Sequence, residues 1–119
     1  MVEHHQYICR GLEEFEKRSQ FGDCWITFEA NSKEHWLQCA RGKINMDWPF
    51  SHAPEPQQLQ KYFGTLAPFD VVAWDTDLYA TIKIATNENE ILAVAINRVF
   101  QELYDLGSGY ELSYTFGNI

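Results

Sequence analysis

The sequence lacks the short motifs through which proteins usually hold nucleotides and metals. Its seven glycines never occur in the spacing of a phosphate-binding loop, G-x-x-x-x-G-K or G-x-G-x-x-G. It contains no C-x-x-C pair, and the four histidines share no helical or hairpin spacing. Adjacent side chains on a helix point about 100° apart, so we expect His4 and His5 to be solvated terminal residues. We therefore expect no cofactor and no metal site.

Positive charge is also scarce. Nine Lys and Arg residues stand against 17 Asp and Glu residues, which gives a formal net charge of −8. A surface of this sign repels the phosphate backbone of nucleic acids and anionic lipids. No apolar run approaches the ~20 residues of a membrane-spanning helix. We expect neither nucleic acid nor membrane as a partner; the acidic surface either suits a basic protein or only keeps the chain soluble.

Cysteines are few and odd in number: Cys9, Cys24 and Cys39. The first residues, 1–5, have neither the basic nor the apolar region of a secretory signal. Both observations favour free thiols and a cytoplasmic protein. Cys24 and Cys39 alternate in phase with apolar neighbours, so we expect them to be buried and inert. Because no electropositive setting for a reactive thiol is visible, we expect the chain not to be an enzyme.

Apolar residues, in contrast, make up 45% of the 119 residues, enough for the core of one domain. In the first half, Ile8, Leu12 and Phe15 share one face of an expected helix over residues 3–19. The pattern then changes to alternation, which predicts half-buried strands over residues 24–30, 35–40 and 43–48. Because their turns are too short for a parallel crossover, these strands must form an antiparallel meander.

The second half contains two more helices and a further hairpin. Pro56 suits the first turn of a short helix, and Gly64 suits a left-handed cap at its end. Asn87 is expected to cap the longest helix, and Gly107 is expected to close it. The other expected elements are strands over residues 70–74 and 78–85 with a turn at 75–77, a helix over residues 88–106, and an optional last strand over residues 110–116.

The order of these elements is α-β-β-β-α-β-β-α, with the optional strand last. Strands and helices are segregated along the chain and do not alternate as β-α-β units, so the sheet should be antiparallel. The sequence therefore predicts one α+β domain over residues 1–119, an antiparallel sheet with helices on one side.

This element order, together with the aromatic placement, resembles a known family. The residues that carry the resemblance are Trp25–Glu29, His35–Gln38, the hairpin to Trp48, Leu59–Pro68 and the long helix Glu88–Leu106. They resemble the type III secretion chaperone fold and its YbjN-like relatives, bacterial proteins with no catalytic site. The resemblance implies a homodimer that holds a partner polypeptide. The final segment, residues 110–119, departs from the family pattern; if it pairs with the sheet, it occupies an edge that a partner would otherwise use.

Two tryptophans mark the face of the sheet opposite the helices. Trp25 and Trp36 fall out of phase with the apolar residues of their strands, so both should point to the open face. Such side chains either bind a partner or form a second small core, and the leading hypothesis is that Trp25, Trp36 and Gln38 bind a partner protein. Four other aromatic side chains are expected in the main core: Phe15, Phe28, Phe63 and Phe100.

Two other functions remain open. An acidic inhibitor that masks a basic toxin or enzyme would use Asp75, Asp77, Glu88 and Glu90 as a charge mimic. Asp75 and Asp77, with Asp70 nearby, could also hold a hard cation, but Asp is a common turn residue and we favour the turn. The third alternative is a pocket for a small ligand under the longest helix, which no polar constellation in the sequence supports.

Overall fold

The first half of the chain folds as one helix followed by an antiparallel meander. The computed structural model describes residues 4–18, 24–31, 34–40, 42–86 and 88–118. The first elements are α1 (His4–Arg18), β1 (Cys24–Ala30), β2 (His35–Ala40) and β3 (Lys43–Asp47), which confirm the predicted ranges. Gly42, with a φ of 71°, makes the bend between β2 and β3, a conformation that favours glycine.

The second half adds a short helix, a hairpin, a longer helix and a last strand. Both helices end in a wider, π-helical segment. The elements are α2 (Pro56–Leu59) with η2 (Gln60–Gly64), β4 (Phe69–Asp75), β5 (Tyr79–Ile84), α3 (Asn89–Arg98) with η3 (Val99–Leu103), and β6 (Leu112–Asn118). The optional strand is thus a full strand of the sheet.

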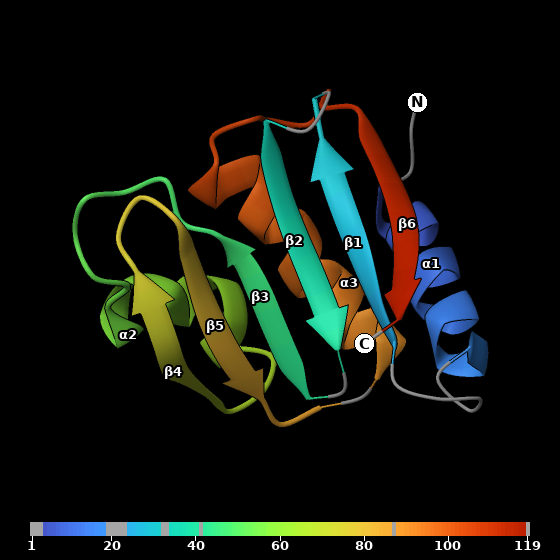
Figure 1. Ribbon diagram of the computed structural model, residues 1–119, viewed down its shortest axis with the longest axis horizontal. Coiled ribbons are helices and arrows are strands. Elements are labelled where there is room, and N and C mark those ends of the chain that lie inside the picture. The colour runs from blue at the N-terminus through green and yellow to red at the C-terminus, as the bar shows by residue number, and fades with distance from the viewer. Residues whose placement is uncertain (1–3, 19–23, 32–33, 41, 87, 119) are drawn as a thin grey trace.

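Two pairings join parts of the chain that are far apart in sequence. β5 pairs with β3, and β6 pairs with β1 along the whole length of both strands. The sheet therefore has the order β4-β5-β3-β2-β1-β6, with every neighbouring pair antiparallel. Figure 1 shows the helices behind the sheet and its other face uncovered. This arrangement confirms the predicted α+β class.

The helix ends show which of the predicted caps form. Gly107 is left-handed, with a φ of 69°, but it does not close the helix, which ends at Leu103 and is followed by the left-handed Asp105, with a φ of 57°. Gly64 is not left-handed, and the prediction of a cap there was wrong, because the π-helical segment runs through Gly64 and its cap position is Thr65. Asn87, the predicted cap of the longest helix, lies outside the described residues. The cap position of α3 is occupied by Glu88.

The core lies between the covered face of the sheet and the helices. Phe15, Phe28, Phe63 and Phe100 are all buried there, as predicted. Fully buried side chains include those of Ile26, Leu37, Ile44, Met46 and Ile82 on the strands and of Trp48 directly after β3. All three cysteines are free thiols and buried. No helix in the described part of the chain has the length and apolar character needed to span a membrane.

His4 does not behave as predicted. Its side chain is only 5% exposed, and its Nε2 atom lies 2.7 Å from the carbonyl oxygen of Tyr110. The two rings stack with their centres 3.8 Å apart. The prediction of a solvated His4 was wrong because the segment before β6, far away in sequence, folds back over the first turn of α1.

Candidate functional site: the open face of the sheet

The structure places the three predicted partner-binding residues on the uncovered face. Trp36 pairs with Glu29, and Gln38 pairs with Thr27. Directly paired residues of antiparallel strands point to the same face. Trp25, two residues before Thr27, therefore shares this face, and all three side chains are half-buried. The predicted orientation is confirmed, and the binding role stays a prediction.

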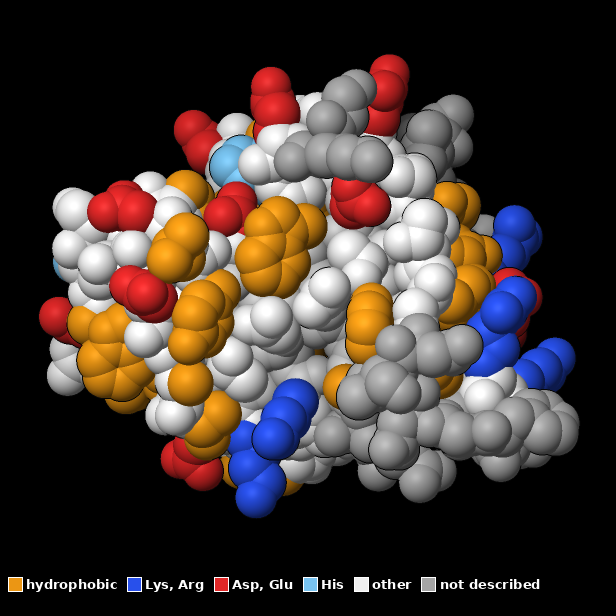
Figure 2. Space-filling view, viewed as in Figure 1, with side chains coloured by type: hydrophobic (Ala, Val, Ile, Leu, Met, Phe, Trp, Pro, Cys, Tyr) orange, Lys and Arg blue, Asp and Glu red, His pale blue; other side chains and the backbone are white. Residues whose placement is uncertain are grey.

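Three rows of side chains cross the open face at right angles to the strands. The acidic row holds Glu29, Trp36, Asp47, Tyr79 and Asp75. The neutral row holds Thr27, Gln38, Asn45 and Thr81. The basic row holds Trp25, Ala40, Lys43 and Lys83, with Asp70 opposite Lys83 at the edge. Figure 2 shows this face, with acidic side chains along its upper edge, basic ones below, and polar ones between separate hydrophobic side chains.

The indole of Trp25 lies against the backbone of β6. Trp25 pairs with Gly117, where an added Cβ would come within 2.5 Å of the indole. A glycine is required at this position because any side chain would occupy the place of the ring. Beside the ring, a hollow of about 280 Å³ is lined by Trp25, Gln38, Ala40, Lys43, Asn45 and Thr81.

The floor of this hollow is held by a hydrogen bond across two strands. The Thr81 hydroxyl donates to Oδ1 of Asn45 at 3.0 Å. This bond leaves the Asn45 amide nitrogen free to donate from the floor of the hollow. Neutral amides and hydroxyls can therefore accept or donate hydrogen bonds in the centre of the face, without the desolvation cost of a charged group.

In the acidic row, Asp47 accepts hydrogen bonds from two side chains, His35 and Tyr104. Nδ1 of His35 donates to its carboxylate at 2.9 Å, and the Tyr104 hydroxyl donates to its backbone oxygen at 2.5 Å. The His35 ring stacks on the Tyr104 ring with 4.5 Å between the centres. Burial, and then the nearby charge of Asp47, raise the pKa of Tyr104 well above its usual value, so this hydroxyl stays protonated. The network fixes the end of β3 beside Trp36.

The most exposed large hydrophobic side chains were not singled out in the sequence. They are Val72, Trp74 and Leu78, which are 49%, 50% and 59% exposed. They lie on the edge strand β4 and in the turn that follows it. Exposure alternates along β4, with Val71 and Ala73 half-buried, although a bulge between these two residues shifts the register of pairing.

The four carboxylates proposed for an acidic inhibitor do not form one surface. Asp75 and Asp77 lie at the β4–β5 turn, where Asp77 has a φ of 64°, in line with the turn favoured from sequence. Glu88 and Glu90 lie at the start of α3, beyond the opposite end of β5. Six strand residues at about 3.3 Å each separate the two pairs, roughly 20 Å. Asp70 is likewise at the far end of β4 from Asp75, so these carboxylates share no cation site.

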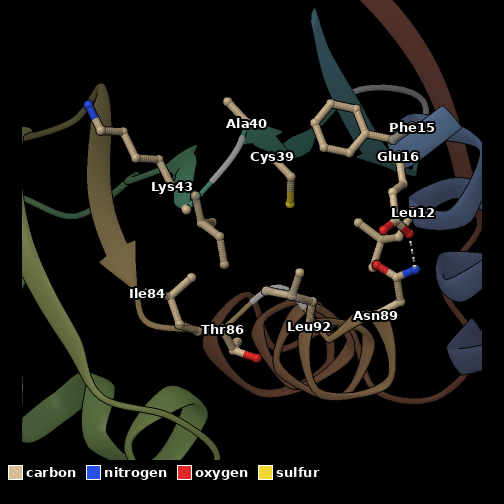
Figure 3. A pocket seen from close by; sticks show the side chains of 12 residues that line it. Leu12, Phe15, Glu16, Cys39, Ala40, Lys43, Ile84, Thr86, Asn89 and Leu92 are labelled. Carbon is tan, nitrogen blue, oxygen red and sulfur yellow. Dashed lines mark hydrogen bonds between the residues drawn. The ribbon is translucent and has the colours of Figure 1, made fainter. Parts of the chain in front are cut away.

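A second cavity opens on the covered side, between the sheet and the helices. It measures about 150 Å³, and Figure 3 shows the Cys39 sulfur pointing into it. Glu16 and Asn89 stand together at its rim, where the Asn89 amide donates to the Glu16 carboxylate at 3.4 Å. Burial raises the pKa of Cys39 to about 12, so its thiol is protonated and unreactive. The cavity is smaller than the roughly 300 Å³ at which ligand pockets begin.

Sequence reasoning also missed a cluster of three side chains on the helices. His5, Cys9 and Glu90 place their ligand atoms within 4.8 Å of one another. His5 and Cys9 are four residues apart, a helical spacing visible in the sequence. Glu90 joins them only because α1 packs against α3.

No family model, curated protein or solved structure matches the chain. The resemblance to type III secretion chaperones therefore stays a prediction that rests on the order of the elements. β6 departs from the pattern of that family, because it fills the edge of the sheet next to β1. A partner strand could therefore not pair with β1, and the edges of the sheet are β6 and β4.

Proposed function

We propose that this protein is a non-catalytic, chaperone-like or adaptor-like binding domain, with the open face of its sheet as the contact surface. The observation that carries the proposal is the position of Trp25 and Trp36, both half-buried on the face that the helices leave uncovered. Tryptophan is enriched among the residues that contribute most to protein–protein affinity. Uncharged centres with charged rims are also typical of such interfaces, and this face has that pattern.

The partner that the face fits best is a second copy of the same chain. A two-fold axis along the neutral row turns the face over and exchanges the acidic row with the basic row. Trp36 of one copy then lies over Ala40 of the other, so that a large side chain meets a small one. Asp47 lies over Lys43 in the same way, and its carboxylate, although bound to His35 within its own chain, adds negative charge opposite the Lys43 amine.

The size of the face supports this partner. The molecule extends 37 and 32 Å along the two axes that Figure 1 shows in its plane. A stable interface needs roughly 800 Å² from each partner, which a face of these dimensions provides. Sheets that pack face to face cross at about −30°, so the strands of the two copies are not exactly aligned and the paired rows cross at an angle. The centre of the neutral row still lies on the two-fold axis.

A pair of charge variants at Gln38 tests the arrangement. Gln38 lies near the proposed axis, so it meets its own counterpart in the second copy. Gln38→Arg and Gln38→Glu should each give monomers, because like charges meet across the axis. An equimolar mixture of the two should restore the dimer. Sedimentation over a wide range of protein concentration measures the oligomeric state of each variant and of their mixture. Gln57→Arg, exposed on α2, is the matched control.

Trp36→Ala gives a second, independent measurement. It should weaken the dimer at least tenfold and leave the monomer folded. A wild-type chain that stays monomeric at every concentration contradicts the second copy as partner. If Trp36→Ala instead lowers the free energy of unfolding by about 3–5 kcal/mol at every concentration, the ring belongs to a core and the contact surface lies elsewhere.

The alternative of an acidic inhibitor has less support. Its four carboxylates separate into two distant pairs, and Glu90 is already in contact with His5 at 2.6 Å. A partner whose association rate falls steeply with salt would favour the inhibitor, since charge steering is screened by ions.

The proposed setting is the cytoplasm, in keeping with three free thiols.

A further inference from the structure

Three potential metal ligands meet where the first helix crosses the start of the third. His5 and Cys9 lie one turn apart on α1, and Glu90 lies in the first turn of α3. Nε2 of His5 is 3.7 Å from the Cys9 sulfur and 2.6 Å from a Glu90 carboxylate oxygen. One nitrogen, one sulfur and one oxygen thus converge from two helices that are distant in sequence.

The spacing of these atoms fits a tetrahedral ion. Zinc bonds of about 2.3 Å to sulfur and about 2.0–2.1 Å to nitrogen place the two ligand atoms roughly 3.6 Å apart. The observed separation of 3.7 Å between sulfur and nitrogen needs no change. The nitrogen–oxygen separation of 2.6 Å must open to roughly 3.3 Å, and the Glu90 side chain, 80% exposed, is free to move that far.

We propose that His5, Cys9 and Glu90 bind a divalent zinc-type ion, with the fourth position open to water. A thiolate and an imidazole select zinc over magnesium or calcium, which prefer oxygen ligands. The two anionic ligands, Cys9 and Glu90, balance the charge of the ion. Binding releases the thiol proton to solvent, and His5 binds in its neutral form.

The surroundings of Cys9 agree with a site for a cation. Without an ion, the thiol lies within weak hydrogen-bond distance of the Asn89 carbonyl, at 3.8 Å, and of Nε2 of His5, at 3.7 Å. Burial and the nearby Glu90 and Glu13 carboxylates raise the pKa of Cys9 to about 11, since each of them disfavours a thiolate. A bound cation reverses that balance and stabilises the thiolate. The ion would join α1 to α3 and thereby stabilise the folded chain.

Cobalt(II) titration of the untagged protein tests the site. Cobalt should bind one to one and produce an intense thiolate-to-cobalt charge-transfer band with tetrahedral visible bands, and zinc should displace it. Cys9→Ser should abolish the charge-transfer band, and Glu90→Gln should weaken binding at least tenfold. Glu88→Gln, exposed two residues before Glu90, is the matched control and should bind as the wild type does.

Thermal unfolding with and without zinc gives a second readout. Zinc should raise the melting temperature of the wild type and of Glu88→Gln but not that of Glu90→Gln, whose exposed side chain leaves the fold intact. Absence of a charge-transfer band in the wild type overturns the proposal. Equal zinc binding by the wild type and Glu90→Gln also overturns it.

Discussion

The two faces of the sheet are built from the same strands but differ in the kind of side chain they carry and in how far these are exposed. On the covered face, every second residue of β1 is buried, from Cys24 to Ala30. On the open face, Trp25, Thr27 and Glu29 alternate with them and are all partly exposed. The covered face is uniformly apolar because the helices remove it from water. The open face combines rings, amides and charges, a mixture that core packing does not require, and this freedom is what makes it the candidate contact surface.

The largest expected effect comes from comparing one ring on each face. Phe28, fully buried on β1, and Trp36, half-buried on the neighbouring β2, are both aromatic and centrally placed. Phe28→Ala should lower the free energy of unfolding by about 3–5 kcal/mol, because it leaves a cavity. Trp36→Ala should cost the isolated monomer less than about 1 kcal/mol. Urea unfolding at low protein concentration measures both, and equal losses would remove the distinction between the faces.

Alkaline pH should destabilise the fold in part through a buried thiol on the covered face. Burial raises the pKa of the Cys39 thiol from 9.0 to about 12, so this group ionises more easily in the unfolded chain. The protonated thiol's contribution to the free energy of unfolding is fully present below about pH 9 and is lost as pH rises toward about 12. At pH 11 the loss is roughly 2–3 kcal/mol. Urea unfolding between about pH 7 and 11 should show the decline, and Cys39→Ala should reduce it. A constant free energy of unfolding over that range contradicts the prediction.

A smaller effect is expected at the edge of the open face. Gly117→Ala places a Cβ within 2.5 Å of the Trp25 indole and forces the ring off β6. The expected loss is about 1–2 kcal/mol, with a red shift of tryptophan fluorescence as the ring enters water. Gly109→Ala is the control, because an added Cβ there meets no atom within 4 Å. If the two variants had the same stability and the same fluorescence, the position of the Trp25 indole would not depend on Gly117.

The smallest effect should come from the hydrogen bond in the neutral row. Thr81→Val removes the hydroxyl that donates to Asn45 and keeps the shape of the side chain. Because both residues are only half-buried, water can replace the lost partner, and the expected loss is about 0.5–1 kcal/mol. Urea unfolding measures it. A loss above about 2 kcal/mol would mean that this part of the open face behaves as a core.

Local patterns predicted most elements and both faces of the sheet. The alternation in β1 and β2 placed Trp25, Trp36 and Gln38 on the open face because a strand has a side-chain period of two. The same reasoning could not order the strands. Pairing of β5 with β3, and of β6 with β1, depends on long-range packing that no short window of sequence contains.

The failures share the same physical cause. His4 was expected in solvent, but Tyr110 covers it from the other end of the chain. Two of the three potential metal ligands, His5 and Cys9, could have been predicted from their helical spacing, whereas Glu90 is supplied by tertiary packing. Residues whose role depends on a distant partner were therefore the ones misjudged.

The pairing of β6 with β1 has a consequence for synthesis on the ribosome. β1 is made before β6, and β2 to α3 lie between them, so one edge of β1 has no partner strand while all of those elements are translated. Its alternating apolar residues and open backbone groups are those that allow nascent chains to aggregate. Until β6 has been made, the fold therefore depends on β1 not pairing with strands of other chains.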